Sequence, residues 1–407
     1  MSVSAAPHLC RRRGAVSPAG TLIGAVLLAA ALGGPAACAT RPPGPAGAGC
    51  DRDWPLWEAY AAHFISPEGR VIDSAAADHS TSEGQSYALF FALVANDRAR
   101  FDALLAWTRA NLAQGDLAAH LPAWRWGRRD DGSWGVLDPN AASDADLWLA
   151  YALIEGGRIW RDPALGALGR SLASRIVADE VRALPELGPT LLPGPVGFDD
   201  GAGTWRLNPS YLPVQLLRRF AALRLPGPWD ALLASTARMA REVAPHGLFP
   251  DWVAWREGGF APDPVHGSKG SYDAVRVYLW NGMLAPGDAL AAPLAAAGRG
   301  MLALTKARGA VPEVVDSAAR DGAVTNSGPV GFSGALLPAA LRAGDEALGA
   351  ALSARIAAAA RGPLYGEPPR YFDHNLLLFG LGFAEGRYRF AADGALEPRW
   401  SSPCAEH

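Results

Sequence analysis

The stretch Ser82-Glu83-Gly84-Gln85-Ser86-Tyr87-Ala88-Leu89-Phe90-Phe91-Ala92-Leu93 decides the fold. From Tyr87 onward every position carries an apolar or aromatic side chain, so a helix formed here has no polar face. A helix that is apolar all round is buried all round. Ser82 and Gln85 have the spacing of a capping box, which predicts that the helix begins at Ser82.

Five further segments begin with a comparable polar or small cap and continue as an apolar helix. The second of these segments, Asn208-Pro209-Ser210-Tyr211, predicts a helix with proline at its first position. Counted from Glu83, the equivalent positions follow at steps of 61, 65, 64, 59 and 42 residues, at Asp144, Pro209, Asp273, Phe332 and His374. A recurrence of this kind is typical of repeated helix pairs.

An amphipathic helix precedes each buried one. Burial is satisfied if the six buried helices form an inner ring and their partners an outer ring. Strand-like alternation is confined to short pieces such as 191–198 and 387–390. The sequence therefore predicts a single all-α domain, an (α/α)6 barrel. The outer helices are expected at 54–64, 98–112, 163–181, 228–243, 288–307 and 345–360.

Residues 1–39 have the features of an export signal. A basic run at 11–13 precedes an apolar stretch at 20–34 and the small-x-small sequence Ala37-Cys38-Ala39. Cys38 leaves lipidation open as an alternative to cleavage. No later segment qualifies as membrane-spanning, because the long apolar helices carry charges, glycine or proline. We therefore expect a periplasmic or secreted protein.

A Pro/Gly-rich linker at 40–50 is expected to lead into a catalytic domain that covers 51–407. Removal of the leader leaves two cysteines, Cys50 and Cys404, at the two ends of this domain. In an oxidising compartment we expect them to form a disulfide, and two unpaired thiols are the alternative.

The composition excludes two classes of protein. Of 407 residues, 50% are hydrophobic and 19% are charged, which is typical of a folded chain rather than a disordered one. Lysine and arginine number 37 against 40 acidic residues, for a net charge of -3. The arginines are scattered outside the leader, so nucleic acid is not an expected partner.

The predicted ring brings acidic residues to one end of the barrel. Glu83, Asp144, Asp146, Asp273 and Asp373 all stand at the start of inner helices, and these starts open on one face. Each residue taken singly could be a helix cap. Together they supply the two carboxyl groups that glycoside hydrolysis requires, one acid for the leaving oxygen and one base for water.

Aromatic residues near the helix starts suit a sugar ligand. Trp124 and Trp126 lie in the segment Pro122-Ala123-Trp124-Arg125-Trp126-Gly127, which we expect to be a loop. An exposed indole face there can stack on the C–H face of a sugar ring. Packing in the core is the alternative role for either tryptophan.

Two motifs resemble glycoside hydrolase family eight: Thr81-Ser82-Glu83-Gly84-Gln85-Ser86-Tyr87, and Ala142-Ser143-Asp144-Ala145-Asp146 followed by Trp160. The likeness spans about 54–400. It is strongest to the periplasmic endoglucanases encoded with bacterial cellulose synthases, through the segments 54–58, 66–73, 208–213 and 271–278. It implies an inverting endo-β-1,4-glucanase on an (α/α)6 barrel, with no metal or organic cofactor. It also implies β-1,4-glucan as the ligand and the cellulose export machinery as a further partner.

The resemblance assigns a role to each acidic residue. Glu83 corresponds to the general acid and Asp273 to the general base. Asp144 corresponds to a signature aspartate that is commonly given a nucleophilic role. Because an inverting enzyme needs no covalent nucleophile, we expect Asp144 to hold and distort the sugar at the cleavage point.

The remaining assignments concern the surroundings of these residues. Asp146 is expected to be structural. Tyr211, Arg276 and Tyr371 are expected to bind substrate beside the carboxylates. A general acid needs a raised pKa, whereas a helix N-terminus lowers the pKa of a carboxyl group. We expect like-charge repulsion from Asp144 and Asp146 to raise the pKa of Glu83.

Three other functions remain open from the sequence. Related enzymes act on xylan or chitosan, although an aspartate at position 273 favours the cellulase and xylanase branch. The chain could be a non-catalytic glucan-binding component of cellulose export. Asp144-Ala145-Asp146 also matches the DxD of metal-dependent glycosyl transferases, but no nucleotide-binding βαβ unit accompanies it.

Overall fold

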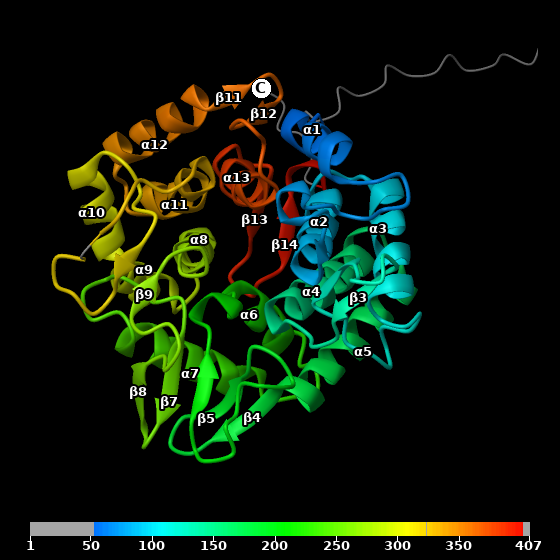
Figure 1. The fold of residues 1–407 in the computed structure, drawn as a ribbon, viewed down its shortest axis with the longest axis horizontal. Coiled ribbons are helices and arrows are strands. Elements are labelled where there is room, and N and C mark those ends of the chain that lie inside the picture. Colours follow the sequence, from blue (N-terminus) through cyan, green and yellow to red (C-terminus); the bar gives the residue numbers. More distant parts are fainter. Residues whose placement is uncertain (1–52, 323, 402–407) are drawn as a thin grey trace, which may run out of the picture. The chain divides into compact units, whose positions relative to one another are not determined.

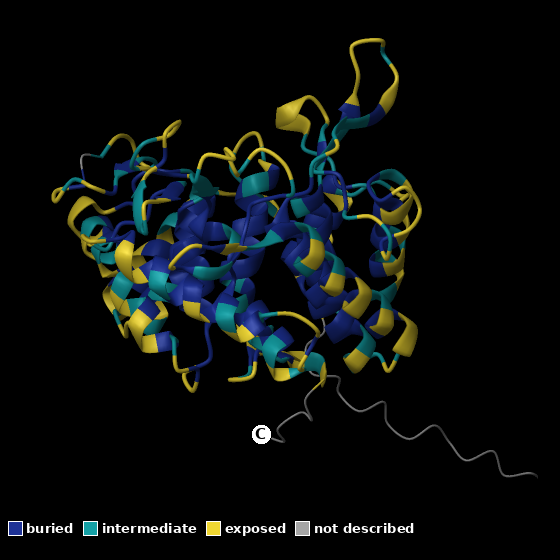
Figure 2. Cartoon of the chain, turned by 90° about the horizontal axis from the view of Figure 1, so that it is seen from below, coloured by how far each residue is buried: buried dark blue, intermediate teal, exposed yellow. Residues whose placement is uncertain are grey.

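The computed structural model describes residues 53–322 and 324–401, which form thirteen α-helices and short antiparallel strands (Figure 1). Six helices form an inner ring, in which each contacts the next and the last returns to the first. These helices are largely buried, whereas exposed residues lie toward the periphery (Figure 2). The inner helices are α2 (Ser82–Val94), α4 (Ser143–Ile159), α6 (Val214–Ala222), α8 (Val275–Met283), α11 (Val330–Arg342) and α13 (Tyr371–Ala384).

The outer helices pack against this ring, and the predicted (α/α)6 barrel is confirmed. Each bears one apolar stripe, as in α3, where Phe101, Leu104 and Leu105 are buried and the arginines face outward. The outer helices are α1 (Pro55–Phe64), α3 (Arg98–Asn111), α5 (Pro163–Glu180), α7 (Trp229–Glu242), α9 (Ala291–Ala297), α10 (Arg299–Arg308) and α12 (Glu346–Ala358).

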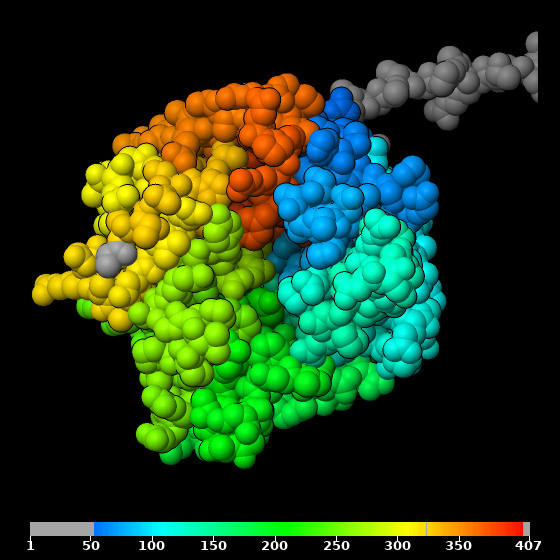
Figure 3. All heavy atoms as spheres, in the orientation of Figure 1, coloured from blue at the N-terminus to red at the C-terminus, as the bar shows by residue number. Residues whose placement is uncertain are grey.

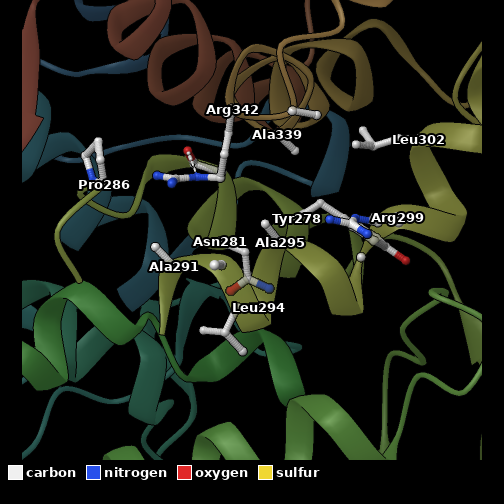
Figure 4. A pocket seen from close by; sticks show the side chains of 14 residues that line it. Tyr278, Asn281, Pro286, Ala291, Leu294, Ala295, Arg299, Leu302, Ala339 and Arg342 are labelled. Atoms are coloured by element: carbon white, nitrogen blue, oxygen red, sulfur yellow. Dashed lines mark hydrogen bonds between the residues drawn. The ribbon is translucent and has the colours of Figure 1, made fainter. Parts of the chain in front are cut away.

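The fifth outer helix is divided, where the sequence predicted one helix over 288–307. α9 and α10 meet at Gly298, and the ring of Tyr278 lies 3.1 Å from the position that a Cβ on this glycine would occupy. The break leaves a hollow of about 560 Å³ between α8, α9, α10 and α11. Arg342 reaches into this hollow from α11 (Figure 4).

The prediction of a capping box at the start of α2 is wrong. Thr81 is the N-cap, and its side chain accepts a hydrogen bond from the backbone N–H of Gly84. Gln85 is fully buried and binds elsewhere: it accepts from the N–H of Val71 and donates to the hydroxyl of Thr108 on α3. A buried amide needs such partners, so Gln85 joins α2 to its neighbours instead of capping it.

Two inner helices begin later than expected. Pro209 starts a 3-10 turn, Pro209–Tyr211, and α6 begins only at Val214. Pro213 explains the delay, because a proline disfavours helical geometry in the residue before it. Asp273 lies in the turn that precedes α8 rather than within the helix.

The strands form hairpins and short pairs in the connections between helices. The piece predicted at 387–390 corresponds to β13, whereas only Leu191 of 191–198 is in a strand. The segment 122–127, expected as a loop, enters strand β2 at Arg125. The sheets are β1 (Ser80–Thr81), β2 (Arg125–Arg128) and β3 (Trp134–Asp138); β4 (Val181–Leu184) and β5 (Gly188–Leu191); β6 (Trp205–Leu207), β7 (Val253–Arg256) and β8 (Gly259–Pro262); β9 (Lys269–Gly270) and β10 (Val315–Asp316); β11 (Ala360–Arg361) and β12 (Leu364–Tyr365); β13 (Tyr388–Phe390) and β14 (Leu396–Pro398).

Aromatic side chains fill the interior of the ring. Phe90, Trp148, Trp280 and Phe379, from four different inner helices, lie with their ring centroids about 5 Å apart in successive contacts. The β13–β14 hairpin packs beneath them, where the hydroxyl of Tyr151 donates to the carbonyl of the hairpin turn. The ring is therefore a packed core rather than a channel.

The predicted export signal at 1–39, the linker at 40–50, and both Cys50 and Cys404 lie outside the described residues. Among the helices that the structure describes, none has the length and apolar character needed to cross a membrane.

Candidate active site

One guanidinium joins two of the predicted catalytic carboxylates. Arg276, in the first turn of α8, places Nη1 2.7 Å from Asp144 Oδ2 and Nη2 2.7 Å from Asp273 Oδ1. Arg276 and Asp144 are buried, whereas the side chain of Asp273 is 30% exposed. The starts of α4 and α8 are thus joined through Arg276, and Asp273 is the carboxylate of the two that solvent reaches.

Tyr87 completes this cluster and was missed from the sequence. Its hydroxyl accepts a hydrogen bond from Arg276 Nη1 at 3.0 Å and donates to Asp144 Oδ2 at 3.3 Å. Tyr87 lies four residues after Glu83, so the two side chains share a face of α2. That spacing was the signal in the sequence for this residue.

Glu83 is held differently from the other two carboxylates. Trp124 Nε1 donates to its Oε1 at 3.2 Å, and no cation among the described residues lies within ion-pair distance. Burial raises the pKa of Glu83 to about 8, and the negative charge of Asp144 is the second contribution in this direction. The raised pKa is the predicted one, but burial is its main cause and charge repulsion from Asp144 comes second.

Asp146 interacts with Glu180, the last residue of α5, and both side chains are completely buried. Burial raises the pKa of both carboxyl groups well above the ordinary range. Two buried carboxyl groups in contact cannot both ionise, so this pair retains a proton.

Burial also raises the pKa of Asp144, against the opposing influence of Arg276. Asp373 instead binds a neighbouring helix, because its Oδ1 accepts the backbone N–H of Gly331 at the start of α11. Burial raises the pKa of Asp373 to about 6. Asp373 therefore links α13 to α11.

Two tyrosines expected at the site lie beside the carboxylate cluster. The guanidinium of Arg276 lies 5.5 Å from the centroid of the Tyr211 ring. The hydroxyl of Tyr371 lies 2.5 Å from the position that a Cβ on Gly84 would occupy. Gly84 therefore lets Tyr371 approach the backbone next to Glu83, and a larger residue there would displace it.

The two tryptophans of segment 122–127 have different surroundings. Trp124 binds Glu83, as described above. Trp126 stacks on Trp134 with ring centroids 5.2 Å apart, and the guanidinium of Arg70 lies within 5 Å of both rings. Trp134, on strand β3, is 45% exposed. Seen as in Figure 1, the barrel is hollowed at its centre, between the blue, green and orange segments (Figure 3).

Comparison with known proteins identifies the family. Residues 36–386 match the model of glycosyl hydrolases family 8. The chain belongs to this family. The resemblance seen in its motifs is therefore confirmed, and the protein is a glycoside hydrolase.

Individual relatives cover nearly the whole chain. It is 49% identical over 391 residues to an endoglucanase of Xanthomonas axonopodis pv. citri, which covers 95% of this chain and 97% of the relative. It is 42% identical over 354 residues to an endoglucanase of Escherichia coli K12, covering 86% and 93%. Among solved structures, an endo-1,4-D-glucanase from Vibrio fischeri ES114 matches with a TM-score of 0.77 at 41% identity, covering 86% of this chain and 100% of that one.

Proposed function

We propose that this family 8 hydrolase is an endo-β-1,4-glucanase that cleaves cellulose with inversion of configuration. Glu83 protonates the glycosidic oxygen as the bond breaks. Asp273 removes a proton from the water that attacks the opposite face of the sugar. Asp144 holds and distorts the sugar at the cleavage point, and Trp124, Trp126, Tyr211, Arg276 and Tyr371 contribute to substrate binding.

The observation that carries this proposal is that the carboxyl groups of Glu83 and Asp273 have different surroundings. Among the described residues, no cation lies within ion-pair distance of Glu83, whose pKa of about 8 means that it holds a proton at neutral pH. Asp273 is partly exposed and forms an ion pair with Arg276. One proton donor and one ionised base are the two states that an inverting hydrolase needs at the start of its reaction.

The relatives support the substrate class. The Xanthomonas and Escherichia proteins are named endoglucanases, and the Vibrio structure is that of an endo-1,4-D-glucanase. We propose further that the enzyme is exported and acts in cellulose biosynthesis, in the periplasm or outside the cell. Its macromolecular ligand is then β-1,4-glucan, with the cellulose export machinery as a further partner.

Product analysis on carboxymethyl cellulose, xylan and chitosan tests the substrate. We expect reducing ends from carboxymethyl cellulose and little or none from the other two polymers. Glu83→Gln protein provides the control for contaminating hydrolases. Preferred cleavage of xylan or chitosan would assign the enzyme to another activity of the family, and binding of glucan without cleavage would make it a non-catalytic component.

Proton NMR of the first-formed sugar tests the stereochemistry. Inversion at a β-linkage gives the α-anomer, and we expect the carboxyl groups of Glu83 and Asp273 to lie about 6.5 to 9.5 Å apart to leave room for water. A β-anomer would contradict the role of Asp273 as base and would favour Asp144 as a nucleophile.

A further inference from the structure

Asp251 lies outside every motif considered above, yet it binds the turn that carries Asp273. It follows the outer helix α7 and precedes strand β7. Its side chain is buried, with 4% of the residue exposed. Twenty or more residues separate it from the groups that it contacts, which lie just before α8.

A single oxygen of Asp251 accepts three backbone hydrogen bonds from this turn. The donors are the N–H groups of Ser271 at 2.6 Å, Asp273 at 3.2 Å and Ala274 at 2.9 Å. Hydrogen bonds to an ionised acceptor are roughly twice as strong as neutral ones. The turn has no capping side chain of its own at α8, so this distant carboxylate satisfies its N–H groups.

The carboxylate is fixed from its other side as well. The backbone N–H of Asp251 donates to the carbonyl of Lys269 at 2.7 Å, and the ammonium of Lys269 lies 3.7 Å from Oδ2. Lys269 belongs to β9, which pairs with β10. Asp251 is therefore held by a paired strand on one side and holds the Asp273 turn on the other.

We propose that Asp251 is a positioning residue for the general base: it fixes the backbone of Asp273 so that the carboxylate meets both Arg276 and the attacking water. This inference rests on the proposed function. A displacement of about 1 Å in an active-site group can reduce the rate about 100-fold. Binding of the glucan chain, which depends on other residues, should change little.

Two substrates separate an effect on the base from an effect on the acid. Carboxymethyl cellulose needs both groups. β-Cellobiosyl fluoride needs only the base: water attacks C1 and passes a proton to Asp273, while the C1–F bond breaks and fluoride leaves without protonation. Glu83→Gln should therefore lose activity on the polymer and keep it on the fluoride, whereas Asp273→Asn should lose both.

We expect Asp251→Ala to behave like a weakened base variant. Its kcat should fall about 100-fold on both substrates, with KM within about threefold of wild type. Asp251→Asn retains an oxygen acceptor but not the charge, so its kcat should fall about tenfold on both substrates.

Asp263→Ala is the matched control, because Asp263 is also buried and accepts hydrogen bonds from two backbone N–H groups, those of Val265 and His266. It should lose thermal stability without a selective loss of kcat.

The outcomes distinguish this inference from the proposed function. A kcat of Asp251→Asn within twofold of wild type on both substrates would overturn the inference, even if Asp251→Ala does not fold. A loss on the polymer with full activity on the fluoride would also overturn it, since the acid would then be affected. If Asp273→Asn protein retains wild-type activity, the proposed function itself has failed.

Discussion

The buried carboxylates at the two ends of α4 differ in the number of arginines that pair with them. Asp144 stands at the start of the helix and Glu155 near its end, about 16 Å away along the axis. At the start, Asp144 and Asp273 share one arginine, and no cation in the described part of the chain lies within ion-pair distance of nearby Glu83. At the end, Glu155 binds both Arg158 and Arg219 and also accepts the N–H of Leu396 in the closing hairpin.

The difference lies in the balance of charge. Near the end of the helix, two arginines face two carboxylates, because Arg219 also pairs with Asp393. At the start, three carboxyl groups face one arginine, so one of them keeps its proton. The same helix therefore contains a neutralised cluster that holds the barrel together and an under-neutralised one that is available for proton transfer.

Glu83→Gln gives the largest expected effect. An amide cannot donate the proton that the leaving oxygen requires, so kcat on unactivated cellulose should fall by about 10³-fold to 10⁴-fold. Folding should be retained, because the uncharged side chain suits this buried site. Steady-state kinetics and urea unfolding of the same protein check both statements. A variant that loses activity and stability together would show that the carboxylate cluster around Glu83 and Asp144 is structural too.

Glu155→Gln should have the reverse effect. Removal of one partner from a buried ion pair leaves the other unpaired and costs about 3 to 5 kcal/mol of unfolding free energy. The kcat of the protein that remains folded should match wild type. Glu242→Gln, which breaks a partly exposed pair with Arg238, is the control and should cost about 1 kcal/mol or less. Equal losses in the two variants would contradict the comparison.

The pH dependence of stability sharpens the contrast further. The pKa of Glu83 is about 8 in the folded chain against an ordinary 4.5, so folding favours the protonated form. The stabilisation is complete below about pH 4.5 and is lost as the pH rises toward 8, by at most about 1.4 kcal/mol per pH unit. Urea unfolding at pH 5.5 and 7.5 should show a smaller difference for Glu83→Gln than for wild type. Parallel behaviour of the two proteins would contradict the assignment.

Trp124→Phe should have the smallest effect. The hydrogen bond from Trp124 lowers the pKa of Glu83, so its removal should shift the alkaline limb of kcat/KM to higher pH by a few tenths of a unit. The phenyl ring retains a surface for stacking. Trp160→Phe is the matched control, because the indole N–H of Trp160 binds Asn96 instead. An unshifted limb in Trp124→Phe would show that this hydrogen bond does not tune the acid.

The ring of helices could be predicted because burial leaves a local pattern. The apolar run from Tyr87 to Leu93 and its repeats are readable without knowing what they contact. The proximity of Glu83, Asp144 and Asp273 was also predictable, since each stands at or just before the start of such a run. Arg276 follows Asp273 by three residues and thus lies near it whenever the helix forms.

The contacts that tune these residues could not be predicted in the same way. Asp251 binds a turn that lies twenty or more residues later, and Glu180 contacts Asp146 only because α5 packs on α4. Gln85 had the spacing of a capping box, but Val71 and Thr108 provide buried partners that no local rule includes. The hairpin β2–β3 was missed because Trp126-Gly127-Arg128 lacks the alternation of a typical strand.

The aromatic filling of the ring restricts how a polymer can approach. Phe90, Trp148, Trp280 and Phe379 occupy the interior, and the β13–β14 hairpin packs beneath them. A glucan chain therefore has no path along the barrel axis and has to cross the end where the carboxylates lie. Threading requires a free chain terminus, whereas crossing does not. If the proposed function holds, cleavage can start anywhere along the polymer, so the viscosity of a carboxymethyl cellulose solution should fall long before much soluble sugar is released.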